Sequence, residues 1–291
     1  MKHVLLLRAP AEEAPDRYEV EFETRGYTPL SIPVLETVPV SIDILKEKIL
    51  HGPKEQAISG VIITSKRAVE AWSEALEVIS QDHRTETPET PVDWGSVPFY
   101  VVGEATAAAT SQIQTNFPSF PHLAPVIIRG GSQSGTAESL AQFILEDLPS
   151  HDNERRKLLY LTGDKNRNTL PQILSTGNID LDVLEVYRTK GSSSFQTDLK
   201  SALERAPIDS TQNWGWVVYF APSAAEFVTP FLHDVFELGG QSTEKPTLKI
   251  AVIGPTTASF LRGTLKLQVN VVASKPTPES LSSAVVAFDS A

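Results

Sequence analysis

The sequence predicts an α/β protein in which mostly parallel sheets carry helices on both faces. Short apolar runs alternate with segments of helical periodicity along the 291 residues. The apolar runs lack the in-and-out alternation of a half-exposed strand, which is typical of strands buried on both faces. Three sequence similarities also recur in the same order in the two halves of the chain. Together these observations indicate two domains of one fold.

The expected elements follow one another in regular alternation. Strands are predicted at 4–7, 61–63, 99–102, 126–128, 158–161, 216–220, 250–253 and 269–272. Helices are predicted between them at 65–79, 104–115, 136–148, 223–238 and 255–267. Residues 81–96, "QDHRTETPETPVDWGS", are polar and rich in proline, which predicts an exposed surface insertion. Residues 239–247 are expected to form a second, shorter surface loop.

The internal repeat has an unusual order. "VIITSKRAVEAW" (61–72) aligns with "VVYFAPSAAEFV" (217–228), "VVGEATAAA" (101–109) with "VIGPTTASF" (252–260), and "TAESLAQFI" (136–144) with "TPESLSSAV" (277–285). The second copy ends there, whereas the first continues into the strand "LLYLTGD" (158–164). The counterpart of this strand 158–164 in the other domain is the N-terminal "VLLLRAP" (4–10). We therefore expect the N-terminal strands to complete the C-terminal domain.

This order predicts a discontinuous first domain and an inserted second domain. Domain 1 is expected at 1–33 plus 188–291, and domain 2 at 38–182. The extended segments 34–37 and 183–187 would cross between them as an antiparallel pair of linker strands. Each domain is expected to be a parallel sheet flanked by helices, of the flavodoxin-like type. A double connection of this kind predicts a hinge with a cleft between the domains.

Composition excludes several classes of function. The formal charge of −11 and the pI of about 5.1 argue against nucleic acid, which is bound mainly through Lys and Arg. With no cysteine the chain has no disulfide or thiolate metal site, and the six histidines are too scattered to suggest zinc. No apolar run is long enough to span a membrane and no signal peptide is evident. We therefore expect a cytoplasmic protein, and a monomer.

The strand-to-helix turns are the expected location of a ligand site. In open α/β sheets ligands bind beyond the carboxyl ends of the strands. The turns here are rich in hydroxyl side chains, glycines and cations. Ser and Thr at helix starts are, however, also common helix caps, and exposed arginines often contact only solvent. "GGSQSG" (130–135) narrowly misses a nucleophile elbow, and no phosphate-binding loop is found, so a hydrolase and a nucleotide-binding protein are disfavoured. The turns lie at 8–10, 64–67, 103–106, 162–167, 220–223 and 254–257.

Five of these segments together resemble one family. "TSKRAVEAW", "VGEATA", "LEVYRT", "FAPSAAEFV" and "IGPTTA", in this order and with the permuted layout, are similar to the uroporphyrinogen-III synthase family. The resemblance implies a lyase without a cofactor that closes the linear tetrapyrrole hydroxymethylbilane into uroporphyrinogen III. Water is lost to give an azafulvene, and the last pyrrole ring is inverted through a spiro intermediate. The substrate would come from hydroxymethylbilane synthase.

The resemblance also implies site residues. Tyr187 matches the family's candidate general acid. Without the resemblance, a tyrosine in this extended segment would be interpreted as a half-buried aromatic of a strand. Two departures from the family pattern are Ala221, where a serine is common, and Glu104, an acid in a turn that faces an anionic ligand. The residues implied to line the cleft and bind the substrate are Ser65, Arg67, Thr106, Lys165, Arg167, Ser223, Thr256 and Thr257.

One alternative comes from a different class. Two domains joined by a hinge are also the architecture of binding proteins that close on an anionic small molecule without chemistry. A different tetrapyrrole or sugar-acid enzyme on the same architecture is a further alternative. Formation of the type III isomer from hydroxymethylbilane distinguishes the synthase from both.

Overall fold

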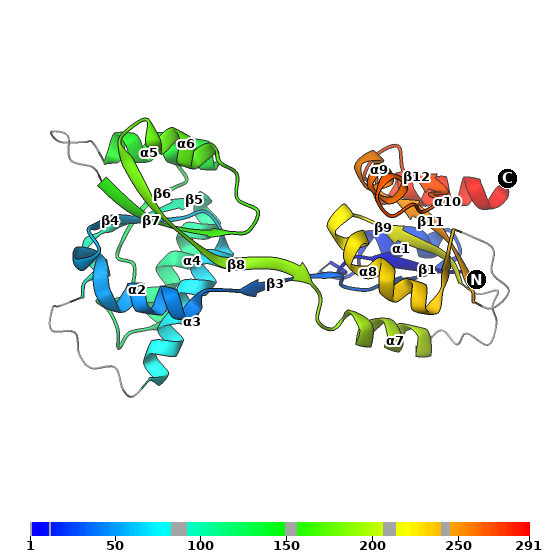
Figure 1. Ribbon diagram of the computed structural model, residues 1–291, viewed down its shortest axis with the longest axis horizontal. Coiled ribbons are helices and arrows are strands. Elements are labelled where there is room, and N and C mark those ends of the chain that lie inside the picture. The colour runs from blue at the N-terminus through cyan, green and yellow to red at the C-terminus, as the bar shows by residue number, and fades with distance from the viewer. Residues whose placement is uncertain (1, 12, 83–91, 149–155, 206–213, 240–244) are drawn as a thin grey trace. The chain divides into compact units, whose positions relative to one another are not determined.

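The chain folds into two compact units, which we call unit 1 and unit 2. Unit 1 contains Met1–Glu36 and Lys190–Ala291, and unit 2 contains Thr37–Thr189. The computed structural model describes residues 2–11, 13–82, 92–148, 156–205, 214–239 and 245–291 (Figure 1).

Unit 2 is built on a sheet with the strand order β3-β8-β7-β4-β5-β6. Neighbouring strands from β8 to β6 are parallel. Each of these strands carries runs of Val, Ile, Leu or aromatic residues, which suit positions buried on both faces. The strands are β3 (Leu35–Pro39), β8 (Ile179–Gly191), β7 (Arg156–Gly163), β4 (Ile58–Ile63), β5 (Pro98–Val102) and β6 (Ile127–Gly131).

Helices cover both faces of this sheet. Because successive strand residues point to opposite faces, Val61 and Ile63 pack with α2, α3 and α4, whereas Ile62 packs with α5 and α6. Figure 1 shows α2 and α3 on one side of this sheet and α5 and α6 on the other. Ser65 and Thr136 cap α3 and α5 through their side-chain oxygens. The helices are α2 (Ile42–Glu55), α3 (Lys66–Gln81), α4 (Gly103–Asn116), α5 (Ala137–Asp147) and α6 (Thr169–Ser175).

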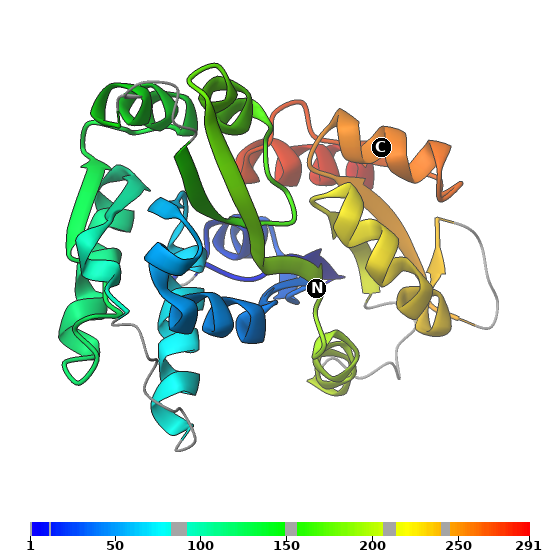
Figure 2. The same ribbon diagram turned by 60° about the vertical axis from the view of Figure 1, so that its left-hand side comes forward.

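Unit 1 has the same three layers. Its sheet has the order β10-β11-β9-β1-β2, with β12 also paired to β11. Helices α7, α8 and α9 pack on one face, and α1 and α10 pack on the other (Figure 1 and Figure 2). The elements are β1 (Lys2–Leu7), α1 (Arg17–Thr24), β2 (Tyr27–Ser31), α7 (Phe195–Arg205), β9 (Trp214–Tyr219), α8 (Pro222–Val235), β10 (Glu237–Leu238), β11 (Thr247–Val252), α9 (Pro255–Gly263), β12 (Val271–Val272) and α10 (Pro278–Ser290).

The two sheets follow one plan with a permuted chain order. Strands β2-β1-β9-β11-β12 of unit 1 correspond in position to β8-β7-β4-β5-β6 of unit 2. The N-terminal β1 thus has the place that β7 has in unit 2, as the repeat predicts. The α/β class with parallel sheets flanked by helices is therefore confirmed.

The two segments that cross between the units lie next to each other. β3 is the neighbour of β8 in the strand order. The Val40 N–H donates to the Val186 carbonyl at 3.0 Å in unit 2, and the Ser192 N–H donates to the Val34 carbonyl at 3.0 Å in unit 1. Because the residue number rises on one segment while it falls on the other, these two bonds follow an antiparallel order.

The prediction of an exposed insertion at 81–96 is wrong at its C-terminal end. Gln81 is the last residue of α3, and 83–91 lie outside the described residues. Trp94, in a short 3₁₀ turn (Trp94–Ser96), is fully buried. Its ring lies 5.2 Å from that of Trp72, and its Nε1–H donates to the Ile49 carbonyl at 2.8 Å. This indole therefore belongs to the core of unit 2.

Two predicted helices end earlier than expected. The helix expected at 223–238 stops at Val235, and Glu237–Leu238 form β10 beside β11. The helix expected at 255–267 stops at Gly263, although Leu267 is buried in the same core. In both places apolar residues after the helix also face the core, so the periodic pattern continues beyond the helix. In the loop expected at 239–247, Thr247 already begins β11, and 240–244 lie outside the described residues.

Candidate functional site

Six of the nine predicted site residues lie at the carboxyl edge of the unit 2 sheet. Ile63 of β4 is level with Val101 of β5 and with Leu161 of β7, so these strands end at the same edge. The turns that follow the three strands carry the predicted residues, and β8 reaches the same edge at Tyr187. The residues gathered there are Ser65, Arg67, Thr106, Lys165, Arg167 and Tyr187.

Ser65 and Tyr187 form a direct hydrogen bond at this edge. The Ser65 hydroxyl donates to the Tyr187 hydroxyl oxygen at 3.1 Å. The same Ser65 oxygen accepts the Ala68 N–H at 3.3 Å and so caps α3. Tyr187 is half-buried, and its ring packs against the core of unit 2. Ser65 can therefore cap α3 with its oxygen and still use its hydroxyl proton at the predicted site.

Asp164, which the sequence marks only as an acid in a turn, holds the end of β8. Its N–H donates to the Tyr187 carbonyl at 3.3 Å. Its carboxylate accepts the Thr189 N–H, also at 3.3 Å. Asp164 therefore fixes the backbone on both sides of Tyr187's neighbour Arg188.

Residues 164–168 form an exposed basic loop after β7. Lys165 and Arg167 are exposed, and neither has an ion-pair partner among the residues that the structure describes. Tyr160, buried in β7, donates its hydroxyl to the Asn166 side-chain oxygen at 2.9 Å. This bond anchors the middle of the loop, so the two cations project from a fixed point.

The remaining two residues of this edge differ in availability. Arg67 is exposed and forms an ion pair with Glu70, one turn along α3, at 3.3 Å. Such an exposed pair contributes little to stability and leaves the guanidinium accessible. Thr106 is only 7% exposed within α4. Arg67 is therefore better placed than Thr106 to contact a ligand in solution.

The carboxyl edge of the unit 1 sheet carries the other three predicted residues. Val252 of β11 is level with Tyr219 of β9, so the turns after these strands lie together. Ser223 and Thr256 are exposed, whereas Thr257 is 3% exposed.

The starts of α8 and α9 at this edge have no side-chain caps, whereas Asp16 caps α1 and Thr277 caps α10. Gly254 is the cap residue of α9 and Pro255 follows it at the first helical position, so neither threonine caps the helix. Ala221 is the cap residue of α8 and makes no side-chain hydrogen bond.

Arg8, at the end of β1, belongs to the same edge but is absent from the predicted set. Its guanidinium donates to Asp16 at 2.7 Å and lies 4.9 Å from the centre of the Tyr18 ring. Burial alone would raise the pKa of Asp16, but hydrogen bonds from Arg8 and from the Ala11 and Glu19 backbones lower the pKa below its usual value. In the sequence, the apolar run "LLL" followed by "RAP" indicates a turn at Arg8. Because Arg8 is neutralised by Asp16, its role here is to fix the turn.

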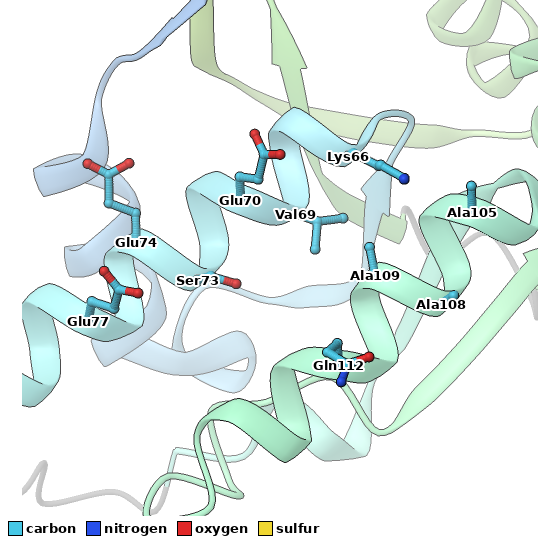
Figure 3. A pocket seen from close by; sticks show the side chains of 10 residues that line it. All are labelled: Lys66, Val69, Glu70, Ser73, Glu74, Glu77, Ala105, Ala108, Ala109 and Gln112. Atoms are coloured by element: carbon cyan, nitrogen blue, oxygen red, sulfur yellow. The ribbon is translucent and has the colours of Figure 1, made fainter. Parts of the chain in front are cut away.

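One groove within unit 2 is lined by none of the predicted site residues. It has a volume of about 730 Å³ and lies between α3 and α4 (Figure 3). Alanines of α4 form one wall, and Glu70, Glu74 and Glu77 of α3 line the other. Lys66 is the one cation in this lining, and Glu74 and Glu77 have no ion pair among the described residues, so the net charge of the lining is unfavourable for an anionic ligand. The groove is therefore a poor place for the substrate that the predicted residues would bind.

Neither a metal centre nor a membrane span is found in the described part of the chain. Groups of three or more His, Asp or Glu side chains arranged to hold an ion are absent from these residues. None of the described helices is both long and apolar enough to cross a bilayer.

Comparisons with known proteins give a consistent result. The family model described as "Uroporphyrinogen-III synthase HemD" matches residues 16–283. The curated uroporphyrinogen-III synthase of Schizosaccharomyces pombe is 32% identical over 99% of this chain and 98% of its own length. That of Saccharomyces cerevisiae is 28% identical over 93% of this chain and 90% of its own length.

Solved structures of two bacterial proteins are also similar along the whole chain. The uroporphyrinogen-III synthetase of Helicobacter pylori is 18% identical and covers 99% of this chain and 100% of its own, with a TM-score of 0.44. A mutant uroporphyrinogen III synthase of Thermus thermophilus is 17% identical and covers 100% and 99%, with a TM-score of 0.40.

Proposed function

This chain belongs to the uroporphyrinogen-III synthase family, and we propose that Tyr187 is the general acid of its reaction. The enzyme is a cyclising lyase that converts hydroxymethylbilane into uroporphyrinogen III. Since the linear substrate must lose its terminal hydroxyl before the ring can close, a proton donor is needed at that hydroxyl. The residues at the carboxyl edge of unit 2 include one hydroxyl side chain suited to this task.

The hydrogen bond between Ser65 and Tyr187 carries the proposal. It holds the half-buried phenol at the edge where the turns of three strands meet, the edge that also carries Arg67, Lys165 and Arg167. Tyr187 donates its proton to the departing hydroxyl, the C–O bond breaks with its electron pair on oxygen, and water leaves. A positioned acid of this kind accelerates a reaction by about 10²–10⁴-fold.

The proton balance closes without another reactant. Loss of water leaves a cationic azafulvene on the substrate and a phenolate on Tyr187. The last ring attacks through its substituted carbon to give the spiro intermediate, which rearranges to the inverted macrocycle. The proton that the substrate releases when its final ring regains aromaticity returns to the phenolate.

The exposed cations of unit 2 suit a substrate with many carboxylates. Arg67, Lys165 and Arg167 lie at the same edge as Tyr187, although the whole chain has a formal charge of −11. Helices α3 and α4 begin at this edge, and helix N-termini attract anions. We assign the substrate's carboxylates to these groups, with Ser65 and Thr106 as neighbouring hydroxyls.

The carboxyl edge of unit 1 is proposed as a second anchoring surface. Its exposed hydroxyls, Ser223 and Thr256, are available to donate hydrogen bonds to carboxylates. Thr257 is buried and would support the turn rather than extend from it. Binding the chain of pyrroles in a bent form favours attack through the substituted carbon, since positioning supplies several kcal/mol of a barrier.

We further propose that the enzyme works as a cytoplasmic monomer without a cofactor and receives its substrate from hydroxymethylbilane synthase. Large exposed apolar side chains in the described residues are single and scattered, for example Ile44, Val126 and Val183. Isolated residues of this kind do not form an interface. A molar mass from light scattering near that of one chain would support the monomer, and twice that mass would contradict it.

A product assay tests the proposed function. The protein is supplied with freshly generated hydroxymethylbilane, and the products are oxidised and separated into type I and type III isomers. We expect the type III fraction to exceed that of a reaction without protein. A binding protein without chemistry would protect or sequester the bilane and leave the uncatalysed type I isomer as the cyclic product.

A further inference from the structure

Gly163 lies directly opposite Tyr187 on the neighbouring strand. Thr162 of β7 is level with Glu185 of β8, but Gly163 is level with Tyr187, so the register shifts by one residue there. A Cβ added to Gly163 would overlap the tyrosine ring and lie 2.5 Å from Cζ, the carbon that bears the hydroxyl. Gly163 does not have a left-handed backbone conformation. The aromatic ring, and not the backbone, therefore requires glycine at this position.

Ser65 fixes the direction in which Tyr187 can give its proton. The Ser65 oxygen accepts the Ala68 N–H at 3.3 Å, and its own proton goes to the Tyr187 oxygen at 3.1 Å. Because Tyr187 is the acceptor in this bond, its own O–H remains free for another acceptor. Ser65 is the cap residue of α3, which begins at Lys66. The hydrogen bond that Ser65 donates stays on the Tyr187 oxygen after the proton has left.

We propose that Gly163 and Ser65 are positioning residues for Tyr187. Gly163 provides the bare strand surface on which the ring lies, and Ser65 holds the hydroxyl and sets its donor direction. This inference rests on the proposed role of Tyr187 as the general acid. Neither residue needs to touch the reacting atoms to act in this way.

The first test adds a side chain at position 163. In Gly163→Ala the methyl group displaces the ring, so we expect kcat to fall at least several-fold with little change in KM. Gly135→Ala is the matched control in the same unit, because the space around its added methyl group is open. In a Tyr187→Phe background, where the hydroxyl is already absent, Gly163→Ala should lower kcat no further. A further decrease of the same size would overturn the positioning role.

The second test removes the donor while retaining the helix cap. Glycine serves at cap positions almost as well as serine, so Ser65→Gly should keep the melting temperature close to that of the wild type and lower kcat several-fold. Ser65→Thr, which keeps the hydroxyl, should restore kcat. Thr136→Ala removes the cap of α5 in the same unit and serves as the control for cap loss alone. Full activity in Ser65→Gly would contradict the proposal.

A measurement without substrate separates this inference from the proposed function. The ring signals of Tyr187 can be identified in a protein with ¹³C-labelled tyrosine by their absence in Tyr187→Phe. We expect Gly163→Ala to shift these signals and Gly135→Ala to leave them unchanged. Unshifted signals in Gly163→Ala would overturn the positioning role whatever the activity. If Tyr187→Phe is as fast as the wild type, the acid role fails, and the shifts alone then decide whether Gly163 places the ring.

Discussion

At the scale of single residues, Asp289 holds the two ends of the chain together in unit 1. This carboxylate of α10 accepts hydrogen bonds from Lys2 at 3.2 Å, Tyr27 at 3.0 Å, Trp216 at 3.1 Å and Lys249 at 2.6 Å. The four donors come from β1, β2, β9 and β11. One side chain thus ties the C-terminal helix to both the N-terminal and the later strands of the sheet.

The stability of the protein should therefore depend on the charge of Asp289 in acid. Burial alone would raise its pKa, but the donors, led by Lys249, Trp216 and Lys2, lower the pKa to about 2 from 3.8. A lowered pKa in the folded state means that the contribution is present above about pH 4 and is lost as the pH falls toward 2. Asp289→Asn should cost about 2 kcal/mol of unfolding free energy at pH 7 and much less at pH 2.

Urea unfolding of the wild type and Asp289→Asn at both pH values measures this difference. Asp234→Asn, a change at an exposed aspartate of the same unit, is the control. An equal loss for Asp289→Asn at pH 7 and pH 2 would show that the lowered pKa does not contribute.

The sequence was sufficient to place residues in particular turns, but it did not predict contacts between residues that are distant in the chain. The placement of Ser65, Lys165 and Thr256 in turns after strands followed from the rule that parallel strands end at one edge. The bond between Ser65 and Tyr187 joins residues 122 positions apart and depends on the strand order and register. Sequence periodicity reveals neither the strand order nor the register. The role of Gly163 could not be predicted for the same reason, because it depends on the tyrosine ring on the neighbouring strand.

At the scale of elements, the turn at Trp94–Ser96 completes the core between α2, α3 and β5. The Trp94 ring is 5.2 Å from that of Trp72 and 6.5 Å from that of Phe99, both edge to face. The polar, proline-rich residues before it dominate the composition of 81–96 and led to the prediction of an exposed insertion. A single buried indole does not change the average character of such a segment, so composition could not reveal it.

Trp94→Ala should therefore be strongly destabilising. Removing a fully buried tryptophan from a packed core typically costs about 3–5 kcal/mol, and here the Ile49 carbonyl also loses its donor. Chemical denaturation measures the loss, with the exposed neighbour Ser96→Ala as the control. A loss below about 1 kcal/mol for Trp94→Ala would restore the surface interpretation of this segment.

At the scale of the whole molecule, the permuted repeat makes the two units unequal in continuity. Unit 2 is one continuous stretch, Thr37–Thr189, whereas unit 1 needs both ends of the chain. The sequence analysis expects a discontinuous domain on the basis of three aligned segments and one missing strand.

The continuous unit should fold without the rest of the chain. A fragment of residues 37–189 contains the strands β7, β4, β5 and β6, β8 as far as Thr189, and the helices on both faces of their sheet. We expect a cooperative thermal transition by circular dichroism and native-like tryptophan fluorescence from the buried Trp72 and Trp94. A fragment of residues 190–291, which lacks β1 and β2, should remain largely unfolded. The reverse result would contradict the assignment of β1 and β2 to unit 1.

The role of Tyr187 is tested most directly by the turnover of Tyr187→Phe with freshly generated hydroxymethylbilane. The phenylalanine ring keeps the packing on Gly163 and removes only the hydroxyl that Ser65 holds. We predict a rate at least several-fold below that of the wild type, with the type III isomer still the main product, because the edges of the sheets continue to position the substrate. A rate equal to that of the wild type would show that Tyr187 is not the acid.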